Sequence, residues 1–319
     1  MIAQKCCAGI DVSRDWLDVY CLWDGAVFRL PNTAEGHSEL IARLGNGSGI
    51  RIGFEATGGH EWPLWQALAG VGFDARQLPP ARIKFFTASC GTGAKTDKID
   101  AEMIARFLAF RPEAGRCIPS ENLRVLKALT TKRAQLVEIR KRHLCQIRAR
   151  RRATVSADMQ ALDRELLELL STQISQVEAR IEANLKAGKA TKNRAENLRS
   201  IPGVGPVLTA ILIAEMPELG ATSDAQIAAL AGLAPIARDS GNMRGKRSIG
   251  GGRRQVRHVL YQAALVAAQH NPVLRAFAIR LRERGKPHKV IITAVARKLL
   301  TIANAICKRN FPWQKNWAN

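Results

Sequence analysis

The sequence predicts an α/β domain at the N-terminus, a helical coiled-coil arm, and a mainly helical domain at the C-terminus. Strand-like and helix-like segments alternate up to about residue 112, which is typical of an α/β layer fold. Between Gly115 and Gly188 there is no glycine and, after Pro119, no proline, which favours long helices. Clusters of glycine and proline then bound a compact helical pattern. We therefore expect domains at residues 1–115, 116–196 and 197–319.

The N-terminal domain begins with apolar alternation from Ala8 to Trp23, which predicts a strand, a bend and a returning strand. Arg51 to Glu55 is predicted as a third strand. A helix-like segment from Glu61 to Ala69 follows, and a short strand-like segment from Asp74 to Leu78 ends at two prolines. This order predicts a sheet covered by helices.

The predicted arm combines an apolar stripe with a strongly basic half. Positions spaced by three and four favour a helix pair or coiled coil; they are Leu166, Leu170, Ile174, Val177, Ile181 and Leu185. Residues 116–152 contain twelve Lys or Arg but only two acids. We expect part of this basic half to bind nucleic acid, through Arg140, Lys141, Arg148, Arg150, Arg151 and Arg152.

A formal net charge of +22 points to a polyanionic partner. A membrane is disfavoured, because Val207–Ala214 is too short to span one and the apolar segment 290–307 contains Arg297 and Lys298. The N-terminus lacks the order of a signal peptide. The seven cysteines are scattered without a C-x-x-C pair, which predicts reduced thiols and no zinc site. The charge therefore favours a soluble, cytoplasmic protein that binds nucleic acid.

Four acids lie where they could converge. Asp11 is in a strand pattern, Glu55 ends the predicted third strand, and Asp97 and Asp100 are three apart at the start of a predicted helix, on one face of it. Hard divalent cations prefer oxygen ligands, and such ions stabilise attacking and leaving oxygens in phosphodiester chemistry. Mg²⁺ is the expected ion. The alternative is that Asp97 and Asp100 only stabilise a helix N-terminus.

A serine near the C-terminal end of the chain is predicted to lie in a glycine- and arginine-rich loop. Ser240 is followed by Gly241, and an accessible hydroxyl among cations is what attack on a phosphate requires. The alternative is a turn or cap serine. Gly250 to Gly252 precede a predicted helix and could offer backbone N–H groups to a phosphate, or act as a linker. The basic residues expected to bind nucleic acid here are Arg238, Arg244, Lys246, Arg247, Arg253 and Arg254.

Residues 198–206, Leu-Arg-Ser-Ile-Pro-Gly-Val-Gly-Pro, have the form of a helix-hairpin-helix turn. Gly203 and Gly205 would let the turn approach a DNA backbone, and the helix from Val207 to Glu215 would present N–H groups to a phosphate. The alternative is a tight packing turn between two helices.

Taken together, these motifs resemble the DEDD transposases with a C-terminal serine, insertion-sequence recombinases guided by a structured bridge RNA. The matching segments follow the family order and span nearly the whole chain; they are Gly-Ile-Asp-Val-Ser at 9–13 with Trp-Leu-Asp-Val at 16–19, Glu-Ala-Thr-Gly at 55–58, Lys-Thr-Asp-Lys-Ile-Asp-Ala at 95–101, Ile-Pro-Gly-Val-Gly at 201–205, and Gly-Leu-Ala-Pro at 232–235 with Asp-Ser-Gly at 239–241.

The resemblance implies a RuvC-like, ribonuclease-H-like N-terminal domain, a coiled-coil arm and a C-terminal transposase domain. It implies that Asp11, Glu55, Asp97 and Asp100 bind Mg²⁺, with Mn²⁺ as an alternative ion. Ser240 would be the nucleophile that forms a covalent 5′-phosphoserine intermediate. The resemblance also implies a homodimer that assembles into a tetramer, in which the acids of one subunit meet the serine of another. A noncoding RNA would pair with target and donor DNA.

Two other functions fit the residues alone. A metal-dependent Holliday-junction nuclease would use the four acids to activate water, and Ser240 would then be structural. A noncatalytic nucleic-acid-binding protein would use the turn and the basic arm, with the acids as helix caps. The four-acid pattern disfavours the second alternative, and Ser240 with its arginines favours recombination over the first.

Overall fold

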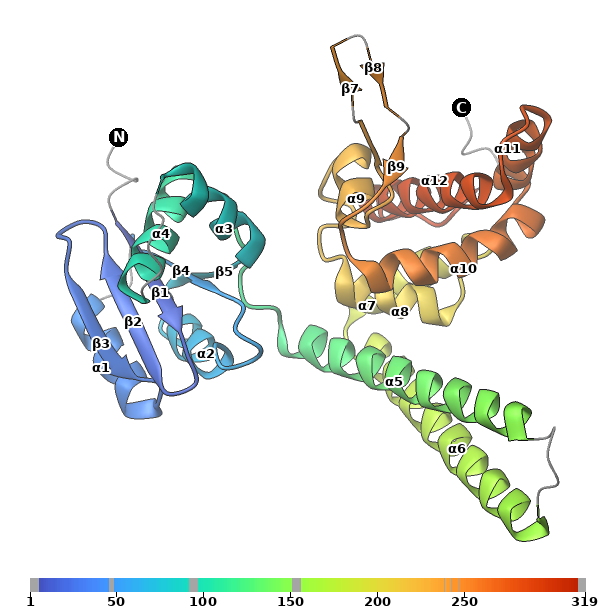
Figure 1. The fold of residues 1–319 in the computed structure, drawn as a ribbon, viewed down its shortest axis with the longest axis horizontal. Coiled ribbons are helices and arrows are strands. Elements are labelled where there is room, and N and C mark those ends of the chain that lie inside the picture. The colour runs from blue at the N-terminus through green and yellow to red at the C-terminus, as the bar shows by residue number, and fades with distance from the viewer. Residues whose placement is uncertain are drawn as a thin grey trace. The chain divides into compact units, whose positions relative to one another are not determined.

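The computed structural model describes residues 6–45, 49–91, 97–150, 156–237, 239–241, 243–245 and 247–314, without the side chains of Asp97 and Lys98. The chain forms two compact units, Met1–Pro119 and Ser120–Asn319 (Figure 1). The first unit has the α/β composition that the sequence predicts, and the second is mainly helical.

The first unit contains a mixed five-stranded sheet in the order β3-β2-β1-β4-β5. β1 (Cys7–Val12), β2 (Trp16–Cys21) and β3 (Val27–Pro31) form an antiparallel meander, whereas β4 (Arg51–Glu55) and β5 (Asp74–Leu78) run parallel to β1. The expected strands are confirmed, β4 and β5 with the predicted bounds. The edge strand β3 was not predicted.

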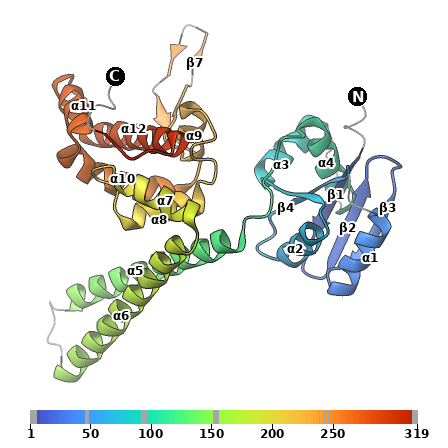
Figure 2. The same ribbon diagram turned by 180° about the vertical axis from the view of Figure 1, so that it is seen from behind.

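Helices cover both faces of this sheet, as Figures 1 and 2 show. α1 (Ala34–Leu44) and α2 (Trp62–Gly70) share a core with the even-numbered residues of β1. Trp65 of α2 packs edge-on against Phe54, with ring centroids 5.3 Å apart, and its Nε1 donates a hydrogen bond to Ala75 O. α3 (Pro80–Ser89) and α4 (Asp97–Phe110) belong to the opposite face, where Cys7 packs in a cluster with Ile104 and Leu108.

α4 lies unusually close to the two central strands because both strands carry glycine at the contact. A Cβ atom on Gly9 would lie 2.0 Å from Ala101 O and 2.5 Å from Ala105 N. Gly53 is the register partner of Gly9, and its Cβ would lie 3.2 Å from side-chain atoms of Ile104 and Leu108. Gly9 therefore lets the backbone of α4 rest directly on β1, and Gly53 leaves room for the side chains of Ile104 and Leu108 over β4.

The second unit begins with two long antiparallel helices, α5 (Glu121–Arg150) and α6 (Ala157–Ala187), which confirm the predicted long helices. Salt bridges join them at Arg133–Glu178, 2.7 Å, and Arg150–Asp163, 2.5 Å. Of the predicted apolar stripe, Leu170, Ile181 and Leu185 are buried, whereas Leu166 is 39% exposed. Ile174 and Val177 are half-buried, so burial of the stripe begins at Leu170 and continues to the C-terminal end of α6.

Six further helices follow: α7 (Lys189–Arg199), α8 (Pro206–Glu215), α9 (Asp224–Leu230), α10 (Arg254–His270), α11 (Pro272–Glu283) and α12 (His288–Arg309). Their core includes Leu126 of α5 and Ile181 and Leu185 of α6. Because the arm and the C-terminal helices share one core, the division suggested at residue 196 stays an interpretation. α12 is the one described helix long and apolar enough to cross a membrane, but half of its apolar window is buried, as in a core helix.

The glycine contact under α4 gives the first prediction. Gly9→Ala should lower the free energy of unfolding by about 3 kcal/mol, because the added methyl group would overlap the backbone of α4. Gly70→Ala is the matched control, since no atom lies within 4 Å of its Cβ position and the exposed end of α2 gains about 0.5 kcal/mol of helix stability. Urea unfolding followed by circular dichroism measures both changes. Equal stabilities for the two variants would contradict the close contact.

Candidate functional site

Asp11 and Glu55 lie side by side on the α4 face of the sheet. β1 and β4 are parallel and in register from Cys7–Arg51 to Ile10–Phe54, so the next positions along the two strands are Asp11 and Glu55. Side chains alternate along a strand, and each acid is two residues beyond a glycine that faces α4. Both carboxylates therefore point to the face that α4 covers, at the carboxyl ends of the two strands.

α4 brings Asp100 toward the same end of the sheet. Gly9 faces Ala101 and Ala105, whereas Cys7, at the start of β1, clusters with Phe107 and Leu108 near the end of α4. The helix thus runs opposite to β1, and its first turn points toward the end of the strand. Asp100, Ile104 and Leu108 are spaced by four along α4 and share the stripe that faces the sheet. Three of the four predicted acids are therefore directed to one region, and the side chain of Asp97 lies outside the described residues.

A further acid, Asp18, is paired with Asp11 across β1 and β2, which places it on the same face. Its carboxylate accepts two hydrogen bonds of 2.8 Å from Arg29 and is only 6% exposed. Because Arg29 neutralises this carboxylate, Asp18 is not available as a fifth cation ligand. The sequence analysis assigned it no role.

The carboxylates present suit a hard divalent cation in their chemistry, since all four donors are oxygens. Among the side chains that the structure describes, however, no group of three acids, histidines or cysteines is gathered as a metal-ion site. Asp11, Glu55 and Asp100 are all described, so the structure does not bring these three carboxylates close enough to form a cation site by themselves, and the side chain of Asp97 lies outside the described residues. The Mg²⁺ site at the four acids therefore stays a prediction.

The loop that follows Glu55 is held by a buried acid, Glu61, whose role the sequence left open. Glu61 Oε2 accepts hydrogen bonds from Thr57 N, Thr57 Oγ1 and Gly59 N at 2.9–3.2 Å. Burial raises the pKa of this carboxyl, but its hydrogen bonds lower the pKa more, so it lies below its usual value and Glu61 is charged. Gly58 and Gly59 have φ of 75° and 116°, which other residues rarely adopt. The loop conformation thus depends on both glycines and on Glu61.

Ser240 lies near the tip of a two-stranded ribbon, not in an irregular loop. β7 (Asp239–Ser240) pairs with β8 (Met243–Arg244), and β6 (Pro235–Ile236) pairs with β9 (Ser248–Ile249) at the base. The ribbon projects from the helices of the second unit (Figure 1). Ser240 is exposed and is followed by Gly241 with φ 52°, at the turn. The hydroxyl is therefore accessible to a large substrate.

An ion pair organises the ribbon beside this serine. Asp239 accepts hydrogen bonds of 2.7 and 2.8 Å from Arg247, and one of 3.1 Å from Gly245 N. Arg244 is the register partner of Asp239 and is exposed. Two described arginines thus lie near Ser240, and one of them is held by the acid that precedes the serine. Arg238 and Lys246 lie outside the described residues.

The base of the ribbon is fixed by close backbone packing and by two arginines. A Cβ on Gly252 would lie 2.2 Å from Gly232 N, and a Cβ on Gly232 would lie 2.3 Å from Gly251 O, which explains glycine at both positions. Arg253, expected to contact a phosphate, instead forms a salt bridge with Glu218 at 2.5 Å. Arg257, which the sequence analysis did not select, donates a 2.5 Å hydrogen bond to Gly251 O. Arg254 is exposed.

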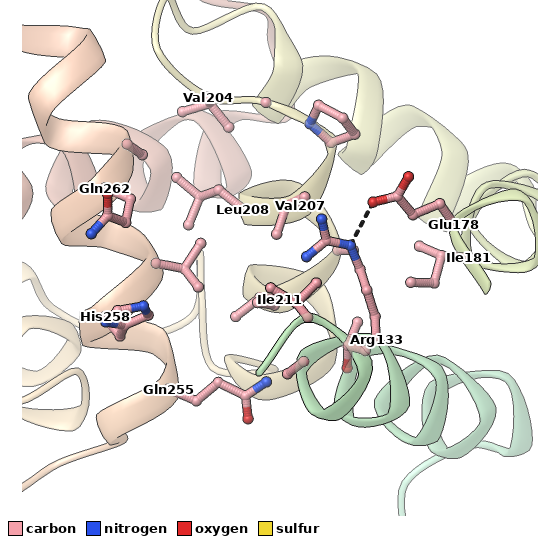
Figure 3. A pocket seen from close by; sticks show the side chains of 18 of the residues that line it. Arg133, Glu178, Ile181, Val204, Val207, Leu208, Ile211, Gln255, His258 and Gln262 are labelled. Carbon is pink, nitrogen blue, oxygen red and sulfur yellow. Dashed lines mark hydrogen bonds and ion pairs between the residues drawn. The ribbon is translucent and has the colours of Figure 1, made fainter. Parts of the chain in front are cut away.

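The predicted hairpin is a short turn between α7 and α8, packed against α10. A Cβ on Gly203 would lie 2.6 Å from Ala267 Cβ, so packing explains this glycine, as the alternative interpretation held. Gly205 is exposed at the N-cap of α8 and has no atom within 4 Å of its Cβ position. Beside the turn, a mostly apolar cavity of about 1020 Å³ is lined by α5, α6, α8 and α10 (Figure 3). A role of Gly203 and Gly205 in DNA binding stays a prediction.

The basic residues predicted on the arm differ in their surroundings. Arg140, Lys141 and Arg148 are exposed on α5. Arg150 is paired with Asp163 of α6. Arg151 and Arg152 lie outside the described residues. Of the four positions that the structure describes, three are thus exposed cations.

Comparisons with known proteins agree in both units. Residues 8–154 match a family model described as a DEDD transposase of the IS110 type, and residues 195–278 match one described as the transposase IS116/IS110/IS902 family. The chain is 30% identical over 328 residues to a pilin gene-inverting protein of Moraxella bovis, covering 98% of each chain. It is 29% identical to a putative transposase of Sinorhizobium fredii, over 74% of this chain and 72% of that one. It is also 35% identical to an uncharacterised protein of insertion element IS900 from Mycobacterium paratuberculosis, over 44% of this chain and 35% of that one.

The Asp239–Arg247 pair gives the second prediction. Asp239→Ala should make trypsin cleave the ribbon after Arg244 several-fold faster, because the ribbon loses its bidentate pair and one backbone hydrogen bond. The melting temperature should fall by less than about 4 °C, since an exposed ion pair stabilises by less than about 1 kcal/mol. Glu39→Ala is the control, because Glu39 forms a similarly exposed pair with Arg43 in the first unit. Unchanged cleavage, measured by mass spectrometry, would show that Asp239 does not organise the ribbon.

Proposed function

Because the chain belongs to the IS116/IS110/IS902 family of transposases and is a DNA transposase, we propose that it exchanges DNA strands through a covalent bond to Ser240. The observation that carries the proposal is the exposed Ser240 at the tip of a ribbon, beside Arg244 and Arg247. The aligned pair Asp11 and Glu55, with Asp100 on the facing helix, supplies the second half of the proposed site.

In the proposed reaction the Ser240 oxygen attacks a phosphodiester, and the bond from phosphorus to the 3′ oxygen breaks. The serine loses its proton, the leaving strand gains one as its 3′ hydroxyl, and the 5′ phosphate stays on the serine. Attack by the 3′ hydroxyl of the other DNA partner then rejoins the strands and regenerates Ser240. Arg244 and Arg247 would stabilise the negative charge that develops on the phosphate oxygens.

Asp11, Glu55, Asp97 and Asp100 would hold Mg²⁺ or Mn²⁺, which when bound supplies positive charge to the reacting phosphate. The acids and the serine belong to different units of the chain. We propose, as in the resemblance above, that the acids of one subunit act with the serine of another, within a dimer that assembles into a tetramer. The RuvC-like character of the DEDD transposases is consistent with the acidic half of this site.

Target and donor DNA and a structured bridge RNA are the proposed partners, in the bacterial cytoplasm. The net charge of +22 suits a protein that contacts backbones in quantity while RNA reads the sequence. Arg140, Lys141 and Arg148 on α5, and Arg254 on α10, are the exposed cations proposed for these contacts. The Moraxella bovis relative is named for inverting a pilin gene, and inversion also requires strand breakage and rejoining.

The third prediction tests the covalent step. Wild type with its flanking noncoding RNA, Mg²⁺ and labelled donor and target DNA should give a protein-linked DNA band on a denaturing gel. Ser240→Ala should remove the band, because the substitution takes away the hydroxyl that attacks the phosphate. Ser248→Ala should retain it, since Ser248 is an exposed serine at the base of the same ribbon.

Two results of this experiment would contradict the proposal, one for the serine chemistry and one for RNA guidance. Free cleaved ends that persist in Ser240→Ala would favour the junction nuclease that uses water. A band that does not depend on the RNA would contradict RNA guidance while leaving the serine chemistry in place.

The fourth prediction separates chemistry from binding. Asp11→Asn should abolish cleavage and strand exchange, because the cation loses a charged ligand, while RNA and DNA affinity stay near wild type. Electrophoretic mobility shifts measure the affinities. A parallel loss of nucleic-acid binding and of folding would contradict a purely chemical role for Asp11.

A further inference from the structure

The loops that follow β1 and β4 are joined by one side chain, Asn32. Its Nδ2 donates hydrogen bonds to Ser13 O, at 2.9 Å, and to His60 O, at 3.2 Å. Ser13 is two residues beyond Asp11, and His60 is in the loop that begins after Glu55. Backbone carbonyls can only accept, so the amide nitrogen must face both of them.

This orientation of the Asn32 amide determines its contact with His37. Asn32 Oδ1 then faces His37 Nε2 at 2.8 Å, and because Oδ1 only accepts, Nε2 must carry a hydrogen. His37 is only 5% exposed and lies in α1. The side-chain amide of Asn32 therefore has one orientation, in which one N–H hydrogen points to Ser13 O and the other to His60 O.

Glu61 joins the loop that follows β4 to strand β5. It follows His60 directly, is 3% exposed, and gathers Thr57 and Gly59 as described above. Its other oxygen, Oε1, accepts a 2.7 Å hydrogen bond from Gln77 Nε2. Gln77 lies in β5, next to Leu78, which is the register partner of Glu55.

Arg116 fixes the orientation of the Gln77 side-chain amide. Its Nε donates to Gln77 Oε1 at 2.7 Å, and Nη2 donates to the same oxygen. Gln77 therefore cannot turn its amide around, because its nitrogen would then face a guanidinium. Glu61 consequently meets donors on both of its oxygens, and no neutral side chain of the same shape can satisfy them all.

From these contacts we infer that Asn32 and Glu61 are positioning residues: they hold the loops that follow β1 and β4, and thereby keep Asp11 and Glu55, near the ends of these strands, at the spacing that one divalent cation requires. Their hydrogen bonds end on the segments that leave the two acid-bearing strands, and neither residue belongs to the proposed ligand set. The inference rests on the proposed function of the four acids. Groups that orient metal ligands in this way typically change metal affinity by 10–100-fold when removed.

The test measures Mn²⁺ binding to the full-length protein by electron paramagnetic resonance, with the melting temperature of each variant. Glu61→Gln should weaken Mn²⁺ binding about 10-fold, because its amide places a donor against either Gln77 or the Thr57 loop. Glu61→Gln combined with Gln77→Glu should restore it, since the amide introduced at position 61 then donates to a carboxylate that Arg116 neutralises. Asn32→Ala alone, with Glu61 left in place, should also weaken Mn²⁺ binding about 10-fold.

Two controls separate the possible failures. Asn197→Ala removes an exposed amide contact with Asn310 in the second unit and should leave Mn²⁺ binding unchanged. Glu55→Gln should abolish binding at this site; if it binds Mn²⁺ like wild type, the acid site itself is wrong and the inference falls with it. If Glu55→Gln loses the ion while Asn32→Ala and Glu61→Gln keep wild-type affinity, the positioning role alone is overturned. Failure of the Glu61–Gln77 exchange to restore binding in a variant that melts like wild type would also overturn it.

Discussion

The direct contact between the backbone of α4 and strand β1 determines where the acids of the first unit lie. Gly9 and Gly53 are register partners, and side chains at either position would push the helix away from the sheet. Since Asp11 and Glu55 are two residues beyond these glycines, the same strand alternation that places the glycines under the helix also directs the acids to it. The first turn of α4 then carries Asp97 and Asp100 to the strand ends.

Close backbone packing has the same role in the second unit. Gly232 and Gly252 touch at the base of the ribbon, and Gly203 lets the turn before α8 rest on α10. Two salt bridges hold the backbone where glycine packing does not: Arg253 pairs with Glu218 at the start of α10, and Asp239 pairs with Arg247 in the ribbon. Asp239, which precedes Ser240, and Arg253 therefore hold the backbone of this region, whereas Arg244 and Arg254 remain exposed.

The sequence predicted the strands and helices that have clear hydrophobic patterns or lack helix breakers. β4 and β5 are short buried strands bounded by glycine or proline, and α5 and α6 lack helix breakers, so their patterns are strong. β3 is an edge strand of the sheet with mixed burial, so its pattern is weak. Ser240 was placed in a loop because two-residue strands are too short to show alternation.

Contacts between residues far apart in the chain could not be predicted. Arg253 was expected at a phosphate, but Glu218 lies 35 residues away and no local pattern indicates the pairing. The same applies to Asn32, which joins two loops, and to Gln77 with Arg116. Glu61 had a signal in retrospect, since an acid four residues after Thr57 and two after a pair of glycines can cap the loop between them.

In the proposed cation site, the carboxylates of Asp11 and Glu55 bind one divalent cation together with the acids of α4. Crystals of the full-length protein grown with Mn²⁺ test it most directly, by anomalous scattering at the manganese edge. We expect an anomalous peak between Asp11 and Glu55, with a carboxylate oxygen of Asp97 or Asp100 completing the protein ligands. Manganese bound elsewhere on the chain, with the Asp11 and Glu55 carboxylates making no contact to it, would contradict the claim.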